Sequence, residues 1–137
     1  MLRFLLLAIP LVVLILAGSY FVLDHLDRLP HTAQAEFRLG QGQLPGRTVI
    51  SLWVLEALAL SALFLLVQGR MASWWGDGLL AGWIAWIFRG PLLVLTASGA
   101  ARLDPAPWWA MAQQWLLLYS LCGLALAGLA RGLKVER

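Results

Sequence analysis

Residues 48–67 read TVISLWVLEALALSALFLLV, a run of 20 residues in which Glu56 is the one charged side chain. A helix of about 20 apolar residues crosses the roughly 30 Å hydrocarbon core of a bilayer. Three further stretches have the same apolar character: 4–23, 79–98 and 109–130. In lipid, an apolar segment satisfies its own backbone polar groups only as a helix. The sequence therefore predicts an all-α polytopic membrane protein, a bundle of four transmembrane helices.

The composition of the 137-residue chain supports this fold class. Hydrophobic residues make up 61% and charged residues 12% of the chain, whereas soluble domains average roughly 45–50% and about 25%. These fractions exclude a disordered chain and an ordinary soluble enzyme, and the single Cys excludes a disulfide scaffold. The net charge of +3 does not indicate a nucleic-acid binder, because several of the 10 basic residues lie next to membrane segments. We expect a lipid bilayer around the chain and no nucleic acid.

The four spans leave little of the chain outside the membrane. We expect a single transmembrane domain over 1–137, with an extracytoplasmic loop over 24–47. The start of the chain has a second interpretation, because an apolar run followed by small residues at 17–19 resembles a cleavable signal peptide. The run continues to Leu23 and exceeds the about 7–15 residues of a signal-peptide core. We therefore favour an uncleaved first helix.

The orientation in the membrane follows from the basic residues, which concentrate in cytoplasmic loops. Four crossings place both termini and the loop over 68–78 on one side. That side carries a small excess of basic residues: Arg3, Arg70, Arg131, Lys134 and Arg137, against Arg28, Arg38, Arg47 and Arg102 on the other. We predict cytoplasmic termini. A composition rich in Leu, Ala, Gly and Trp with few Lys is typical of a protein from a GC-rich bacterial genome, and we therefore expect the bacterial inner membrane.

Two charged residues, Glu56 and Arg89, lie inside the predicted spans. A charge at the centre of a membrane helix costs roughly 2.5–3.5 kcal/mol on insertion scales, so such side chains usually face the bundle interior and pair with each other. Spans 48–67 and 79–98 are joined by a short loop, which makes them antiparallel neighbours. At 1.5 Å per residue, Glu56 and Arg89 lie about 12 Å and about 13.5 Å from the outer ends of their spans. These matching depths predict an intramembrane ion pair.

Aromatic and polar residues at similar depth are expected to support this pair. Trp86 lies three residues before Arg89 on the same helix face, which predicts a cation–π contact. Tyr119 in the fourth span is expected to donate a hydrogen bond into the cluster. Pro91 has no amide hydrogen and leaves the carbonyl of Ile87 without its helical donor. The guanidinium of Arg89, with five donors, can satisfy that carbonyl.

Other residues carry weaker signals for helix contacts. Gln113 and Gln114 lie near the outer end of the fourth span, where one can hydrogen-bond between helices and the other can face the interface. The glycines that begin and end 78–82 and 128–132 have the spacing that lets helix backbones approach closely. This spacing indicates helix contacts, either within the chain or with a partner.

No constellation of residues points to catalysis, a cofactor or a metal. Asp24, His25, Asp27 and His31 in the outer loop are ligand types, but their spacing matches no zinc pattern. Cys122 has no histidine in its span to activate it and is expected to be a packing residue. We therefore predict no metal, no cofactor and no catalytic residue.

Three functions are compatible with these residues. The first is a non-catalytic protein that binds another membrane protein, as an accessory or assembly subunit or as an immunity-type protector against a membrane-active toxin. The second is a small homo-oligomeric transporter or channel with Glu56 and Arg89 in its pathway, and the third is a small enzyme acting on a lipid. The pair itself either locks two helices together or binds a proton, an ion or a partner residue. A matched pair leaves no net charge to attract a substrate, so we favour the locking role and the first function.

Overall fold

The computed structural model describes residues 2–25, 46–101 and 106–135, which form five α-helices and no strand. Within these residues, four segments are long and apolar enough to cross a membrane: Leu2–Ser19, Ile50–Val67, Trp74–Thr96 and Trp108–Gly132. The protein is therefore an all-α, multi-pass membrane protein, and the predicted bundle of four transmembrane helices is confirmed.

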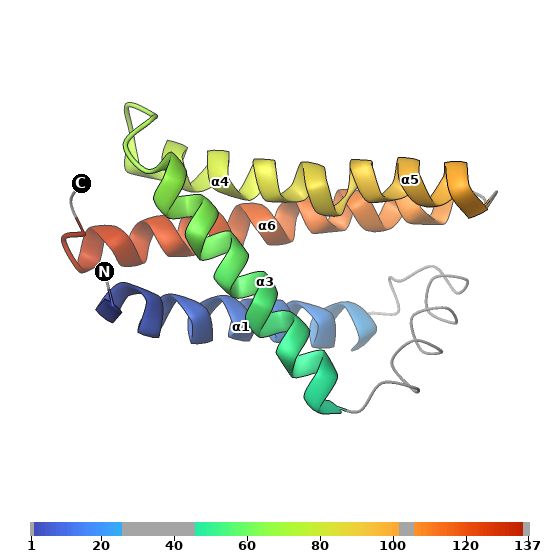
Figure 1. Ribbon diagram of the computed structural model, residues 1–137, viewed down its shortest axis with the longest axis horizontal. Helices are drawn as coiled ribbons and strands as arrows, with labels where there is room; N and C mark the ends of the chain where they lie inside the picture. Colours follow the sequence, from blue (N-terminus) through green and yellow to red (C-terminus); the bar gives the residue numbers. More distant parts are fainter. Residues whose placement is uncertain (1, 26–45, 102–105, 136–137) are drawn as a thin grey trace.

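The helices run back and forth through the bundle. Helix α1 spans Leu2–His25 and α3 spans Gly46–Val67. The third span consists of α4 over Trp74–Arg89 and α5 over Pro91–Ala101, and α6 spans Ala106–Gly132. Figure 1 shows α4 and α5 running end to end beside α6, with α3 crossing the bundle obliquely. The start of α1 and the end of α6 lie at the same end of the bundle (Figure 1), as four crossings require.

The third span is divided at Gly90, because Pro91 has no amide hydrogen to donate to the carbonyl of Ile87. The amide of Gly90 still donates to the carbonyl of Trp86 at 2.7 Å, so the chain stays helical on both sides of the missing bond. The guanidinium of Arg89 makes no hydrogen bond to the Ile87 carbonyl within the described part of the chain. The sequence therefore locates the break in the helix, but that expected role for Arg89 is wrong.

Helix α4 begins at Trp74, before the predicted start of this span at residue 79. The extra turn contains Asp77, whose charge makes the segment resemble a loop in the sequence. In the structure the Asp77 carboxylate accepts hydrogen bonds from the amides of Gly69 at 2.7 Å and Met71 at 2.9 Å. These bonds close the connection between α3 and α4. Because the carboxylate is held by nearby backbone donors, the helix extends through a charged residue that is only 6% exposed.

The hydrophobic core begins with a stripe along α1. Phe4, Ala8, Val12 and Leu16 recur every fourth residue and are at most 1% exposed, and this spacing keeps them on one helix face. The ring of Phe4 stacks on that of Phe64 in α3 with centroids 5.9 Å apart. The stripe thus holds α1 in the bundle, while Leu2, Leu6, Leu7 and Leu14 face outward.

Helices α4 and α6 pack backbone to backbone at glycines. A Cβ atom added to Gly78 would lie 2.8 Å from the Cβ of Ala127, and one added to Gly82 or Gly123 would collide with the backbone of the facing helix. Small residues allow this approach in membrane helices, where van der Waals contact drives association. The predicted glycine spacing over 78–82 is therefore a contact within the chain.

The second pair of glycines, Gly128 and Gly132, does not bring any two of the described helices into close backbone contact. A Cβ added to Gly132 would meet no atom within 4 Å, and one added to Gly128 would only reach the Trp74 ring at 4.0 Å. Cys122, in contrast, is fully buried on α6, in agreement with its expected role as a packing residue.

Candidate functional site

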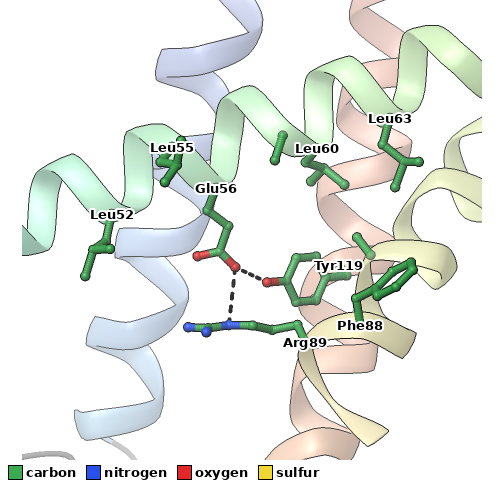
Figure 2. Close-up of a pocket in the computed structure, with 10 residues that line it drawn as sticks. Leu52, Leu55, Glu56, Leu60, Leu63, Phe88, Arg89 and Tyr119 are labelled. Atoms are coloured by element: carbon green, nitrogen blue, oxygen red, sulfur yellow. Dashed lines mark hydrogen bonds and ion pairs between the residues drawn. The ribbon is translucent and has the colours of Figure 1, made fainter. Parts of the chain in front are cut away.

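The candidate site is a groove of about 570 Å³ between α3, α4 and α6, which we call the α3–α4 groove. Its walls are apolar apart from one polar cluster, in which each of the three helices supplies one side chain: Glu56, Arg89 and Tyr119. Figure 2 shows these side chains converging beside leucines of α3 and Phe88 of α4. The wall leucines are Leu52, Leu55, Leu60 and Leu63.

The two charged residues lie side by side, as their matching depths predict. The hydroxyl of Tyr119 donates a hydrogen bond to Glu56 Oε1, and Arg89 Nε lies 3.7 Å from the same oxygen. Figure 2 shows Glu56 and Tyr119 pointing toward each other, with the Arg89 guanidinium lying across from the carboxylate. A separation of 3.7 Å is too long for an N–H···O hydrogen bond. Glu56 and Arg89 therefore form an ion pair without a direct hydrogen bond.

The aromatic partner of Arg89 is Trp115 rather than Trp86. The guanidinium carbon lies 5.3 Å from the centroid of the Trp115 ring, within the about 6 Å range of a cation–π contact. The indole N–H of Trp86 instead donates to the carbonyl of Ala112 at 2.6 Å. The predicted Trp86 contact is wrong because a partly buried indole N–H needs an acceptor, which the backbone of α6 provides.

The sequence contains one signal that makes Trp115 a second candidate for this contact. This residue lies four positions before Tyr119 on α6, and residues four apart share one helix face. A tyrosine expected to reach the ion pair therefore brings Trp115 toward it as well.

The two glutamines of α6 lie apart from the polar cluster. Gln113 is exposed, and Gln114 lines a different pocket of about 510 Å³ between α1 and α6. Neither side chain lines the α3–α4 groove. The structure thus joins Tyr119 to the charged pair and separates both glutamines from it.

Polar atoms of the cluster remain open to the groove. The side chains of Arg89 and Glu56 are 47% and 24% exposed. Within residues 2–25, 46–101 and 106–135, the terminal nitrogens of Arg89 and Glu56 Oε2 have no hydrogen-bond partner. A guanidinium has five N–H donors, so most of its hydrogen-bonding capacity is unused. Unsatisfied polar groups are unfavourable in hydrocarbon, so the cluster is the part of the groove where a further hydrogen bond would stabilise most.

The described residues do not form a metal site. No three or more His, Cys, Asp or Glu residues among them are grouped so that they can hold a metal ion. The loop residues considered as ligands, Asp27 and His31, lie outside the described residues, and the side chains of Asp24 and His25 are not described.

Comparison of the chain with protein-family models, with curated proteins and with solved structures finds no match. The function is therefore inferred from the geometry and chemistry of the α3–α4 groove.

Proposed function

We propose that this chain is a non-catalytic integral membrane protein that acts by binding another membrane protein, as an accessory or protective subunit. The α3–α4 groove is the docking site. The observation that carries the proposal is the guanidinium of Arg89, which is half-exposed inside a membrane span and has unused donors. A charged group at this depth normally faces a partner or a protein interior. A second membrane protein in the groove supplies that environment.

A transmembrane helix matches both the walls and the cluster of the groove. Leu55 and Phe88 are among the most exposed apolar side chains of the bundle, and they offer the van der Waals contact that drives helix association in lipid. A lipid acyl chain offers apolar contact but no polar group at the level of Arg89. A transport pathway needs polar groups along its length, whereas this groove is polar only at the cluster.

We also propose that the protein lies in a bacterial inner membrane with both termini in the cytoplasm. The support is the set of exposed basic residues where α1 begins, α3 connects to α4 and α6 ends: Arg3, Arg70, Arg131 and Lys134. Such residues are retained on the cytoplasmic side. In a Cys122→Ala background, a Gly132→Cys variant should react with a membrane-impermeant maleimide in inside-out vesicles and not in intact cells. The reverse pattern would overturn this orientation.

Purification of the tagged chain from its native membrane in mild detergent tests the docking proposal. Leu55→Trp narrows the groove, while Leu6→Trp changes a leucine of α1 that has the same exposure, 63%, and does not line the groove. We expect one other membrane protein in stoichiometric amount with the wild type and with Leu6→Trp, and its loss with Leu55→Trp. Recovery of the chain alone, at a multiple of 15.1 kDa, would contradict the proposal and favour a homo-oligomeric transporter.

A further inference from the structure

Two unused polar groups of the cluster face the same part of the α3–α4 groove. Glu56 uses Oε1 for both the Tyr119 hydroxyl and Arg89, and its Oε2 has no partner within the described residues. Arg89 directs Nε toward Glu56 and lies over the Trp115 ring, which leaves the N–H groups of both terminal nitrogens as donors. Figure 2 shows the second carboxylate oxygen of Glu56 and the terminal nitrogens of Arg89 pointing in the same direction. The free acceptor and the free donors therefore belong to two neighbouring side chains, whose paired atoms Glu56 Oε1 and Arg89 Nε lie 3.7 Å apart.

An occupant that completes this site must give Arg89 an acceptor and Glu56 a donor at the same time. A carboxamide has both, because its carbonyl oxygen accepts and its NH₂ group donates. It is also neutral, so it leaves the charge balance of the ion pair unchanged. A carboxylate would add a second negative charge beside Glu56, and an ammonium group would add a second positive charge beside Arg89. Unbalanced charge is unfavourable at membrane depth.

We infer that the α3–α4 groove recognises a transmembrane helix that carries an asparagine or glutamine at the level of Arg89. The carboxamide oxygen accepts from the terminal N–H groups of Arg89, and the carboxamide NH₂ donates to Glu56 Oε2. The apolar remainder of the partner helix packs on the leucines of α3 and on Phe88. This inference rests on the proposed function, since it specifies the chemistry of the partner that the groove binds.

Synthetic transmembrane peptides test the inference without changing the fold of the chain. Four leucine–alanine peptides of about 20 residues differ only at the central position, which is Gln, Leu, Glu or Lys. Each is titrated against the full chain in phosphatidylcholine vesicles, by energy transfer and at a peptide-to-lipid ratio that keeps the peptide monomeric. We expect the Gln peptide to bind about tenfold more tightly than the Leu peptide, and more tightly than the Glu and Lys peptides. Equal binding of the Gln and Leu peptides, or tightest binding of a charged peptide, would overturn the inference.

Variants of the chain then test whether the preference for the Gln peptide over the Leu peptide depends on Arg89. We expect the ratio of Leu-peptide to Gln-peptide dissociation constants to fall close to one in Arg89→Met and to keep its wild-type value in Arg70→Met, which changes an arginine outside the membrane spans. A ratio that survives Arg89→Met would overturn the inference. Failure of the peptide preference does not alter the Leu55-dependent capture of a partner, so the inference and the proposed function can fail separately.

Discussion

The two oxygens of the Glu56 carboxylate differ in their contacts, because only one of them interacts with other side chains of the described part of the bundle. One oxygen accepts from the Tyr119 hydroxyl and faces Arg89, so a single atom connects α3 with α4 and α6. The other has no partner among the residues that the structure describes. Since the contact with Arg89 is 3.7 Å long, the pair compensates charge inside the membrane without holding the two helices tightly. This arrangement supports a binding role for the pair in addition to the locking role.

Replacement of Tyr119 by phenylalanine tests the hydrogen bond that anchors Glu56. Hydrogen bonds between membrane helices contribute about 0.6 kcal/mol on average and at most about 1.7 kcal/mol. We expect Tyr119→Phe to lower the free energy of unfolding by about 1 kcal/mol in a detergent unfolding assay. The control is Leu117→Ala, a change at an outward-facing leucine of the same helix that is 70% exposed. A loss no larger than that of the control would show that the hydroxyl does not hold Glu56.

Exchange of the two charges tests whether Glu56 and Arg89 stabilise each other. Glu56→Gln and Arg89→Gln each leave one charge uncompensated, and we expect each to lower the free energy of unfolding by about 1–3 kcal/mol. The double variant Glu56→Arg with Arg89→Glu should recover part of this loss. Recovery is incomplete because the exchanged charges fit the Tyr119 hydroxyl and the Trp115 ring less well. Additive losses in the double variant would contradict a direct interaction.

The cluster shows which features of a site can be read from a membrane sequence. Depth can be counted along each helix, so the pairing of Glu56 with Arg89 follows from the positions of the spans. The side of each helix that faces its neighbour cannot be counted in this way, because it depends on how α4 packs on α6. For that reason the sequence assigns the cation–π contact to Trp86, whereas the structure gives it to Trp115.

Contact between α4 and α6 depends on positions that lack a side chain. The Cβ positions of Gly82 and Gly123 are occupied by backbone atoms of the facing helix, so any substitution there separates the helices. The same contact fixes Arg89 and Tyr119 relative to each other, because these residues lie on the two helices that the glycines join. The packing of elements thereby determines the geometry of the cluster.

Alanine substitutions test this contact with a matched control. We expect Gly82→Ala and Gly123→Ala each to lower the free energy of unfolding by about 1–3 kcal/mol, the usual effect of overpacking. The control is Gly128→Ala, which lies on α6 like Gly123 and meets nothing closer than 4.0 Å. It should be neutral or slightly stabilising, since alanine favours the helix. Equal effects of all three variants in the same unfolding assay would show that the glycines act through helix propensity rather than packing.

The connection between α3 and α4 depends on Asp77. Its carboxylate accepts from the amides of Gly69 and Met71, and removal of the side chain leaves both amides without this acceptor. We expect Asp77→Ala to destabilise the loop by about 1–3 kcal/mol and to speed tryptic cleavage after Arg70, which is exposed. Asp77→Asn keeps one side-chain oxygen as an acceptor and should show an intermediate rate. Unchanged cleavage in both variants would contradict a role for Asp77 in closing the loop.

At the scale of the whole molecule, hydropathy predicts how many times the chain crosses the membrane and in which order. It does not predict which helices pack against each other. Each apolar run is long enough to cross the bilayer once, which determines four crossings. The first two spans are more apolar than the last two, but hydropathy alone does not show that α4 packs most closely on α6 or that α3 crosses obliquely (Figure 1). The α3–α4 groove results from this packing, and for that reason its walls could not be predicted together with its charged residues.

The central claim is that another membrane protein occupies the α3–α4 groove, and site-specific photo-crosslinking in the native membrane tests it most directly. A photoreactive amino acid replaces Leu55 in the groove or, as the control, Leu6 on α1, two leucines of equal exposure. We predict one crosslinked product from Leu55 that contains a different membrane protein, and none from Leu6. Crosslinks from Leu55 only to lipid or to a second copy of this chain would contradict the claim.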